Sequence, residues 1–313
     1  MKRVISLLVS LALLALIYWK LSQHGQLAQL GRVLMHCDAL WMTLSLAMVV
    51  PLTMLTAWRL QQLMPRAGQL GFAEANRLIL AASVLNLILP SKMGDIAKAW
   101  FMKERGHLDG SLAFSLVIFE KTCDMLSLLL WCALGLILYP AKDALFWTMT
   151  IAVSAAVVFG LVLLGSERLA ASFFRLTRLS RLAAAWAEMH AYFWSSKTRL
   201  TSVALTSIFI WFLHLLQIWM FILALKAYAP FLANLALSPL AILAGLLPLT
   251  FAGVGTRDGA LVLFYRHYFD APTAAALGLL CTARYVLPGL AGLPFVGRYM
   301  TAVHQMQSTR SAT

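Results

Sequence analysis

Three ionisable residues lie near the middle of an apolar run that is long enough to cross a membrane. Glu120, Lys121 and Asp124 interrupt the sequence SLAFSLVIFEKTCDMLSLLLWCALG. A charge at the centre of a membrane helix costs about 2.5–3.5 kcal/mol, so these groups must face protein, water or each other. Glu120 and Asp124 are four residues apart and share a helix face, and Lys121 can pair with Asp124. The cluster is either a structural ion pair between helices or a hydrophilic groove that admits a polar headgroup or takes up a proton.

Two other apolar stretches are interrupted in a common way. Residues 86–95 read NLILPSKMGD and residues 247–259 read LPLTFAGVGTRDG, so each contains Leu-Pro, Gly, a basic residue and an acidic residue. A helix cannot run smoothly through Pro and Gly. Broken helices at matching positions of two halves are typical of the binding site of a membrane transporter.

The first interrupted stretch combines a helix break with charges. Pro90 removes a helix hydrogen bond and Gly94 permits a tight turn, which puts Lys92 and Asp95 at the tip. Backbone N–H groups at a helix start after Gly94 would suit an anionic phosphate, and Lys92 would add positive charge. The stretch, which begins at Asn86, is either a re-entrant site or an ordinary cytoplasmic loop between two short helices.

The second interrupted stretch carries an arginine. Gly255 gives the backbone freedom, and Arg257 can bind a phosphate or a carboxylate through two parallel hydrogen bonds. Asp258 is one candidate partner for Arg257, although adjacent helix residues do not face each other. Residues from the first half of the chain, such as Glu120 or Asp124, are the other candidates. The alternative is an Arg–acid clasp that stabilises the fold.

A further arginine lies inside the apolar run LGLLCTARYVLPGLAGLPF. Arg284 requires an acidic or phosphate partner there, because an unpaired charge within a span is costly. A structural and a functional role are equally open for it. His214 and Gln217 share a face of another apolar run, where such residues more often bridge helices than carry protons.

The sequence lacks the common sequence motifs of enzymes. It has no G-x-x-x-x-G-K-[ST] loop, no G-x-S-x-G and no HExxH, and its four cysteines have no CxxC spacing. We therefore expect no catalytic residues, no cofactor and no metal site.

The composition is that of a helical membrane protein. Of the 313 residues, 61% are hydrophobic and 12% are charged, and the mean hydropathy is +0.81. The net charge of +13 comes mostly from residues between apolar runs, which favours the positive-inside rule and anionic lipid headgroups over nucleic acid.

We expect an all-α integral membrane bundle of about six full spans with two re-entrant or broken helices. The full spans are predicted at residues 4–19, 39–58, 111–139, 144–164, 200–225 and 272–296, and the broken helices at 78–101 and 236–265. If both broken helices are re-entrant, the basic residues fall on the cytoplasmic side, including Arg59, Arg66 and Arg77 after the second span. Both termini are then cytoplasmic, and the setting is a bacterial inner membrane.

This topology makes residues 1–300 one membrane domain with two inverted halves. Residues 39–139 would form the first half-repeat and residues 200–296 the second. In the basic connection at 165–199, arginines alternate with leucines and phenylalanines, which suits either a helix in the membrane interface or a loop that only sets topology. Residues 301–313 are expected to form a disordered cytoplasmic tail.

The three motifs occur in the order that a known family shows. They are NLILPSKMGD at Asn86–Asp95, EKTCD at Glu120–Asp124 and PLTFAGVGTRDG at Pro248–Gly259. Through them, roughly residues 1–300 resemble the flippase-like transmembrane domain family, which includes the membrane part of lysylphosphatidylglycerol synthases. Asp95 and Asp258 stand where that family more commonly has Glu. The synthases carry a soluble aminoacyl-transferase domain after the membrane part, so the resemblance implies the lipid-moving part alone.

The resemblance and the buried charges together predict a lipid translocase. It would move an anionic or headgroup-bearing lipid through a charged groove between the halves, with the cations binding the phosphate and the carboxylates positioning the cations. An enzyme or accessory subunit that acts on a lipid-linked headgroup, and a non-transporting scaffold, are the alternatives. The expected partner is a membrane lipid, and a homo-oligomer is left open. The predicted site comprises Asn86, Pro90, Lys92, Gly94, Asp95, Glu120, Asp124, Gly255, Arg257, Asp258 and Arg284.

Overall fold

The computed structural model is built from helices. It describes residues 2–23, 25–88, 94–106, 108–138, 142, 144–176, 180–246 and 253–310, and these contain no strand. The predicted all-α architecture is confirmed. The helices are α1 (Lys2–Gln23), α2 (Leu27–Met35), α3 (Ala39–Ala47), α4 (Val49–Leu63), the 3₁₀ turn η1 (Arg66–Gly68), α5 (Phe72–Ile88), α6 (Gly94–Gly106), α7 (Gly110–Leu138), α8 (Ala144–Gly165), α9 (Glu167–Leu176), α10 (Ser180–Trp194), α11 (Lys197–Ala224), α12 (Phe231–Leu246), α13 (Thr256–Phe264) and α14 (Ala271–Arg310).

Five described helical segments are long and apolar enough to cross a membrane. They are Ala39–Leu63, Gly110–Leu138, Phe146–Gly165, Lys197–Ala224 and Ala271–Gly297. These segments match five of the six predicted full spans, and α1 covers the remaining one as a helix of 22 residues. The segment formed by α3 and α4 continues to Leu63 rather than ending at residue 58, because Leu60 and Leu63 extend its buried apolar face.

Both interrupted stretches form pairs of short helices. In the first stretch α5 and α6 flank residues 89–93, and in the second α12 and α13 flank residues 247–252. The 17 residues of α5 extend about 25 Å at 1.5 Å per residue, which is less than the ~30 Å hydrocarbon core of a bilayer. Pro90 and Lys92, which belong to the predicted site, lie outside the described residues.

Glycines let the two helices of each pair approach closely. A Cβ on Gly94, the first residue of α6, would lie 2.4 Å from the carbonyl oxygen of Ala82 and 2.8 Å from the backbone nitrogen of Asn86. Gly253 has a φ of +76°, and a Cβ there would lie 2.7 Å from the carbonyl oxygen of Gly245 near the end of α12. Only glycine permits both this backbone conformation and this distance.

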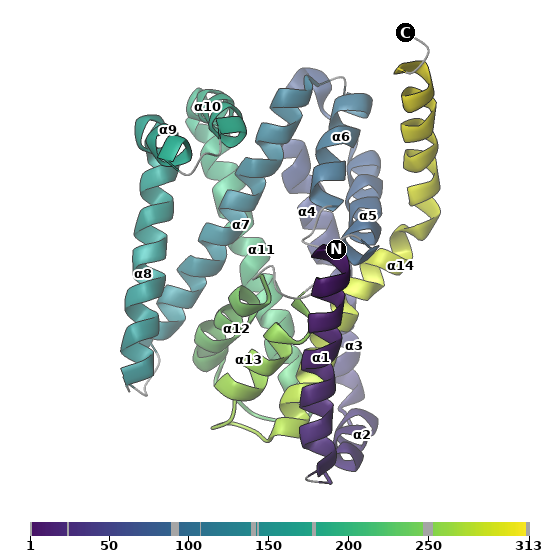
Figure 1. Ribbon diagram of the computed structural model, residues 1–313, viewed down its shortest axis with the longest axis vertical. Helices are drawn as coiled ribbons and strands as arrows, with labels where there is room; N and C mark the ends of the chain where they lie inside the picture. Colours follow the sequence, from purple (N-terminus) through teal and green to yellow (C-terminus); the bar gives the residue numbers. More distant parts are fainter. Residues whose placement is uncertain are drawn as a thin grey trace.

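The two helix pairs enter the bundle from opposite ends. Figure 1 shows α5 and α6 in the upper half and α12 and α13 in the lower half, and the ends of both pairs next to their connecting residues line one cavity. We call α5 with α6 the first hairpin and α12 with α13 the second hairpin. Their head-to-head placement is what an inverted repeat predicts, while the boundaries of the half-repeats stay a prediction.

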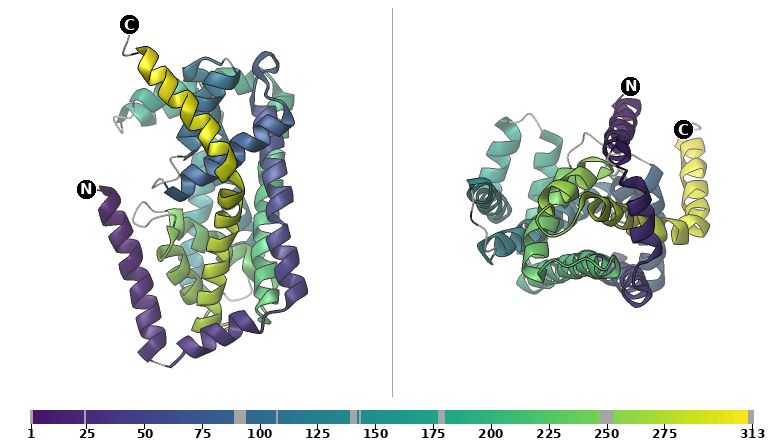
Figure 2. Two further views of the ribbon diagram at one scale, coloured as in Figure 1. Left: turned by 90° about the vertical axis from the view of Figure 1, so that its right-hand side faces the viewer. Right: turned by 90° about the horizontal axis from the view of Figure 1, so that it is seen from below.

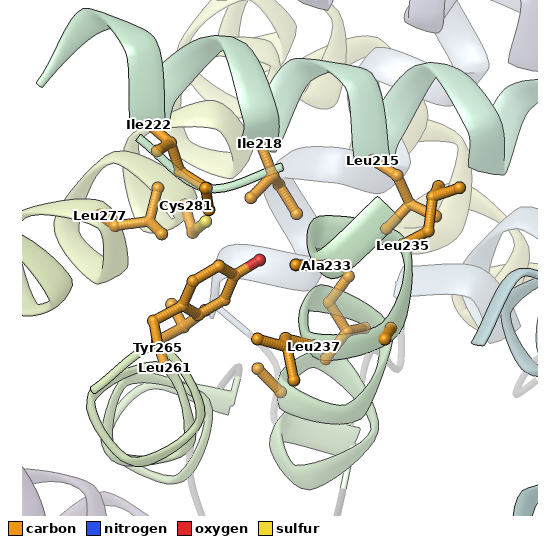
Figure 3. Packing of buried hydrophobic residues seen from close by; sticks show 14 of the residues in the cluster. Leu215, Ile218, Ile222, Ala233, Leu235, Leu237, Leu261, Tyr265, Leu277 and Cys281 are labelled. Atoms are coloured by element: carbon orange, nitrogen blue, oxygen red, sulfur yellow. The ribbon is translucent and has the colours of Figure 1, made fainter. Parts of the chain in front are cut away.

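A buried apolar cluster fixes the second hairpin against α11 and α14. Figure 3 shows side chains from these four helices pointing toward one another. The hydroxyl of Tyr265 lies 2.8 Å from Ser238 Oγ and donates a hydrogen bond of 3.1 Å to Asn234 Oδ1, so this buried polar group has partners. The labelled residues are Leu215, Ile218, Ile222, Ala233, Leu235, Leu237, Leu261, Tyr265, Leu277 and Cys281.

The basic connection at 165–199 contains two short helices. The helix α9 buries Ala170 and Phe174 and exposes Leu169 and Leu176. Figure 1 places α9 and α10 at the same end of the bundle as the C-terminus. A helix with exposed leucines at one end of a membrane bundle suits the interface, and that position stays a prediction.

The two ends of the chain extend from the bundle. Figure 2 shows α1 standing beside the other helices, with α2 crossing the lower end. The helix α14 continues to Arg310, so the described residues 301–310 extend a helix where the sequence predicted a disordered tail.

Replacing Gly292 with alanine is expected to destabilise the protein by about 1–3 kcal/mol, the usual effect of overpacking. A Cβ there would lie 2.1 Å from the carbonyl oxygen of Leu80, so α14 must move away from α5. Thermal unfolding in detergent measures this. The control is Gly31→Ala, where a Cβ meets nothing within 4 Å and the helix should gain roughly 0.5–1 kcal/mol. Equal melting temperatures for the two variants would contradict the contact between α5 and α14.

Candidate functional site

A cavity of about 240 Å³ lies where the two hairpins meet. Both hairpins line its wall, the first with residues that include Asn86 and Asp95 and the second with residues that include Gly245 and Arg257. The helices α4, α7, α11 and α14 also contribute. The interrupted stretches therefore converge on one site, as a shared binding site requires. The predicted site residues that line the cavity are Asn86, Asp95, Glu120, Asp124, Arg257 and Arg284.

An arginine of α4 joins the two carboxylates of α7. Arg59 donates a hydrogen bond of 2.7 Å to Glu120 Oε1 and one of 2.5 Å to Asp124 Oδ1. Its guanidinium also donates to Ser207 Oγ at 2.9 Å, and the indole of Trp211 donates to Asp124 Oδ1 at 3.2 Å. The side chains of Arg59 and Glu120 are 3% and 1% exposed, so the pair is removed from solvent.

Two lysines complete this cluster. Lys98 of α6 pairs with Glu120 and, at 3.9 Å, with Asp95. Lys121 pairs with Asp95 at 3.1 Å and with Asp124 at 3.4 Å, and the latter pair confirms the sequence prediction. With the arginine of α4, the cluster holds three cations and three carboxylates, so its formal charge is zero. We call these six residues the ionic network; it ties the first hairpin to α4 and α7.

Two members of the ionic network were not predicted from the sequence. Arg59 follows Trp58 at the predicted end of a span, which placed it in a cytoplasmic connection; the structure corrects this and buries it inside α4. The apolar residues that follow Arg59 were the available signal that the helix continues. Lys98 is three residues after Asp95 in a helix, a spacing that allows a pair, but nothing in the sequence shows that it reaches α7.

Arg257 forms an ion pair with Asp258. Its Nη2 and Nε donate to Asp258 Oδ1 at 2.7 and 3.0 Å. Further hydrogen bonds reach Thr282 Oγ1 at 2.7 Å and the carbonyl oxygen of Gly278 at 3.1 Å. Of the candidate partners, the structure shows Asp258 rather than Glu120 or Asp124, and the clasp that was left as the alternative is present.

The clasp forms because α13 begins at this point. Gly255 has a φ of +97° and directly precedes the helix, and its N–H donates to Asp258 Oδ2 at 3.0 Å. This capping bond turns the Asp258 side chain back along the first turn, where its other oxygen meets Arg257. The rule that adjacent residues point apart assumes that neither side chain folds back on the helix.

Arg284 has hydrogen bonds but no carboxylate. It donates to the carbonyl oxygen of His214 at 3.4 Å and to the hydroxyl of Tyr285 at 2.7 Å, and its guanidinium lies 4.7 Å from the centre of the Tyr285 ring. Among the described residues no carboxylate forms an ion pair with Arg284, although the residue is only 4% exposed. The carboxylate partner that the sequence prediction allows is therefore not found among the described residues.

The polar residues of α11 face the same cavity. Gln217 donates from Nε2 to the carbonyl oxygen of Ser45 at 2.8 Å, which confirms the predicted bridge between helices. Gln217, His214 and Trp211 all line the cavity and lie at three-residue steps, so α11 connects the ionic network to Arg284 along one face.

Of the comparisons with known proteins, the match to a protein family covers nearly the whole chain. No curated protein and no solved structure matches the chain. The family model described as the Lysylphosphatidylglycerol synthase TM region matches residues 3–292. That range holds both hairpins, the ionic network and every residue that lines the cavity. The chain therefore belongs to the family of the lysylphosphatidylglycerol synthase transmembrane region.

Proposed function

We propose that the protein is a lipid translocase, in which the headgroup passes through the cavity while the acyl chains stay in the bilayer. The family connects the chain to lipid modification or transport, and the five apolar spans make it a multi-pass membrane protein. The observation that carries the proposal is the cavity, which brings ionic side chains to the point where hairpins from opposite ends of the bundle meet.

The wall of the cavity suits both parts of a lipid. The ionic network, Arg257 and Arg284 offer charges to a headgroup, and aliphatic side chains offer an apolar surface to the adjoining glycerol and acyl carbons. Intramembrane ionisable residues mark the pathways of polar substrates. The aliphatic side chains are those of Val49, Leu52, Ile79, Leu87, Ile210, Ile242 and Leu246.

One side of the ionic network can be reached from outside the protein. The side chain of Lys121 is 43% exposed, and those of Asp124 and Asp95 are 16% and 14% exposed. Exposed ion pairs contribute only about 0–1 kcal/mol. Lys121 can therefore exchange a carboxylate for the phosphate of an entering headgroup at small cost, whereas the buried pair of Arg59 and Glu120 stays in place.

The cellular setting belongs to the same proposal. Basic residues gather in the connections that the positive-inside rule assigns to the cytoplasm, so we place the protein in a bacterial inner membrane with both termini cytoplasmic. The substrate is an anionic or otherwise polar membrane lipid, no nucleic acid is involved, and the protein acts without covalent chemistry.

Reconstitution into vesicles that carry a fluorescent phospholipid tests the proposal. The wild-type protein should move lipid between leaflets faster than empty vesicles do. Lys121→Gln should slow this movement about tenfold, because it removes a charged hydrogen bond to the headgroup. The matched control is Lys197→Gln, which removes one exposed lysine at the start of α11 and should keep the wild-type rate.

Two outcomes would reject the proposal. One is a wild-type rate equal to that of empty vesicles in both membrane orientations. The other is a lipid that mass spectrometry shows to be chemically changed after incubation, because a translocase returns its substrate intact and a membrane enzyme does not.

A further inference from the structure

We infer that Arg284 and Gln217 form a subsite for a phosphodiester headgroup that also donates a hydrogen bond. The inference rests on the proposed function and narrows its substrate class. It starts from two buried polar side chains in the cavity wall whose hydrogen-bonding capacity the described residues leave incomplete.

The first of these side chains carries an uncompensated positive charge. Each partner of Arg284, the carbonyl of His214 and the hydroxyl of Tyr285, is neutral. Its Nε is buried and has no partner among the described residues. A buried guanidinium without a counter-ion is costly, so a ligand that brings an anion to it gains binding free energy.

The charges of the other described cations in the cavity wall are balanced. The ionic network sums to zero, and Arg257 is neutralised by Asp258 at 2.7 Å. Arg284 therefore leaves the described wall with one net positive charge. One net charge matches a phosphodiester, which is a monoanion, better than a phosphomonoester, which carries about 1.5–2 negative charges at neutral pH.

The second side chain is an acceptor without a donor. Gln217 is 1% exposed, and its Oε1 has no partner among the described residues. The orientation of its amide is fixed, because the carbonyl of Ser45 accepts and so must face the N–H₂ group. A buried carbonyl oxygen left unpaired costs about 1–3 kcal/mol when no donor reaches it.

The two side chains line the same cavity and are connected through α11. Gln217 is three residues after His214 on α11, and the carbonyl of His214 accepts a hydrogen bond from Arg284 of α14. A ligand at the junction of α11 and α14 can thus present an anionic oxygen to the guanidinium and an O–H or N–H group to the amide. Asn86 Oδ1, on the first hairpin, is a further buried acceptor in the same cavity.

This arrangement predicts a selectivity among headgroups. Glycerol and ethanolamine phosphodiesters have both the single anionic phosphate and the donor. A choline phosphodiester has the phosphate but no donor, and phosphatidic acid has the wrong charge. A site built to hydrogen-bond a donor discriminates against an analogue that lacks it, because its own polar group is then left unpaired.

The experiment uses vesicles with four fluorescent lipids of equal acyl chains, which carry glycerol, ethanolamine or choline headgroups or the bare phosphate. The wild-type protein should move the first two about tenfold faster than the other two. Gln217→Leu should remove the preference over choline, and Arg284→Gln should slow all the phosphodiesters about tenfold. Arg266→Gln, an exposed arginine outside the cavity, is the matched control and should behave as wild type.

The outcomes separate this inference from the proposed function. If the wild-type protein moves all four lipids at one rate, or if the two cavity variants keep the wild-type selectivity, the subsite is wrong and lipid movement stands. If it moves none of them, the proposed function fails. Calorimetry with dihexanoyl lipids in detergent then still tests the subsite, because Arg284→Gln must weaken phosphodiester binding. Glycerophosphoglycerol that binds as tightly as the short-chain lipid would instead assign the subsite to a soluble ligand and overturn the inference.

Discussion

Replacing Arg59 with methionine is expected to destabilise the protein by about 3–5 kcal/mol, the loss typical when one partner of a buried ion pair is removed. Methionine keeps most of the side-chain volume but leaves Glu120 and Asp124 without the guanidinium that binds both. The network would then hold two cations and three carboxylates. Thermal or denaturant unfolding in detergent measures the change.

A compensating substitution distinguishes charge from packing in this experiment. Adding Asp124→Asn to Arg59→Met restores an equal number of cations and carboxylates, so the double variant should recover a large part of the stability. The control is Arg77→Met, whose side chain is 46% exposed and pairs with Glu74 at 3.5 Å; the change should be at most about 1 kcal/mol. Equal effects for Arg59→Met and Arg77→Met would show that the network contributes nothing to stability.

Replacing Asp258 with alanine should destabilise the protein by a similar amount, about 3–5 kcal/mol, for a different reason. The substitution leaves Arg257, which is 4% exposed, without its carboxylate, and it removes the capping bond to the N–H of Gly255. Both losses fall on the first turn of α13. Unfolding in detergent again provides the measurement.

The double variant Arg257→Met/Asp258→Asn gives the decisive comparison. It removes both charges together and keeps an acceptor for the capping bond, so it should be much more stable than Asp258→Ala alone. If the double variant is as unstable as the single one, the clasp between these adjacent residues does not account for the stability of the second hairpin.

Hydropathy predicted most of the fold because a helix that crosses a membrane must be apolar over its length. A span needs about 20 apolar residues, and the runs at 111–139 and 200–225 differ little from α7 and α11. The hairpins were predicted from Pro and Gly within apolar runs, since those residues break a helix in any context. The contact of α5 with α14 through Gly292 carries no such local signal, because it depends on residues far apart in the chain.

The sequence predicted the acidic residues of the candidate site better than its basic residues. Glu120 and Asp124 lie in the middle of a span, where a charge is costly and therefore indicates a special role. Arg59 stands at the end of an apolar run, where topology alone explains an arginine, and only the three-dimensional structure shows that it bridges the two carboxylates. The partner of Arg257 depends on a glycine conformation that no spacing rule includes.

The hairpins have a consequence for how the chain is threaded. Each one begins and ends at the same face of the bundle (Figure 1). A hairpin that enters the membrane and returns to its starting side does not change the number of full membrane crossings. Every later segment would keep its compartment if a hairpin were deleted, lengthened or duplicated. The central charges of this fold could therefore be rebuilt by sequence change without inverting the remainder of the molecule.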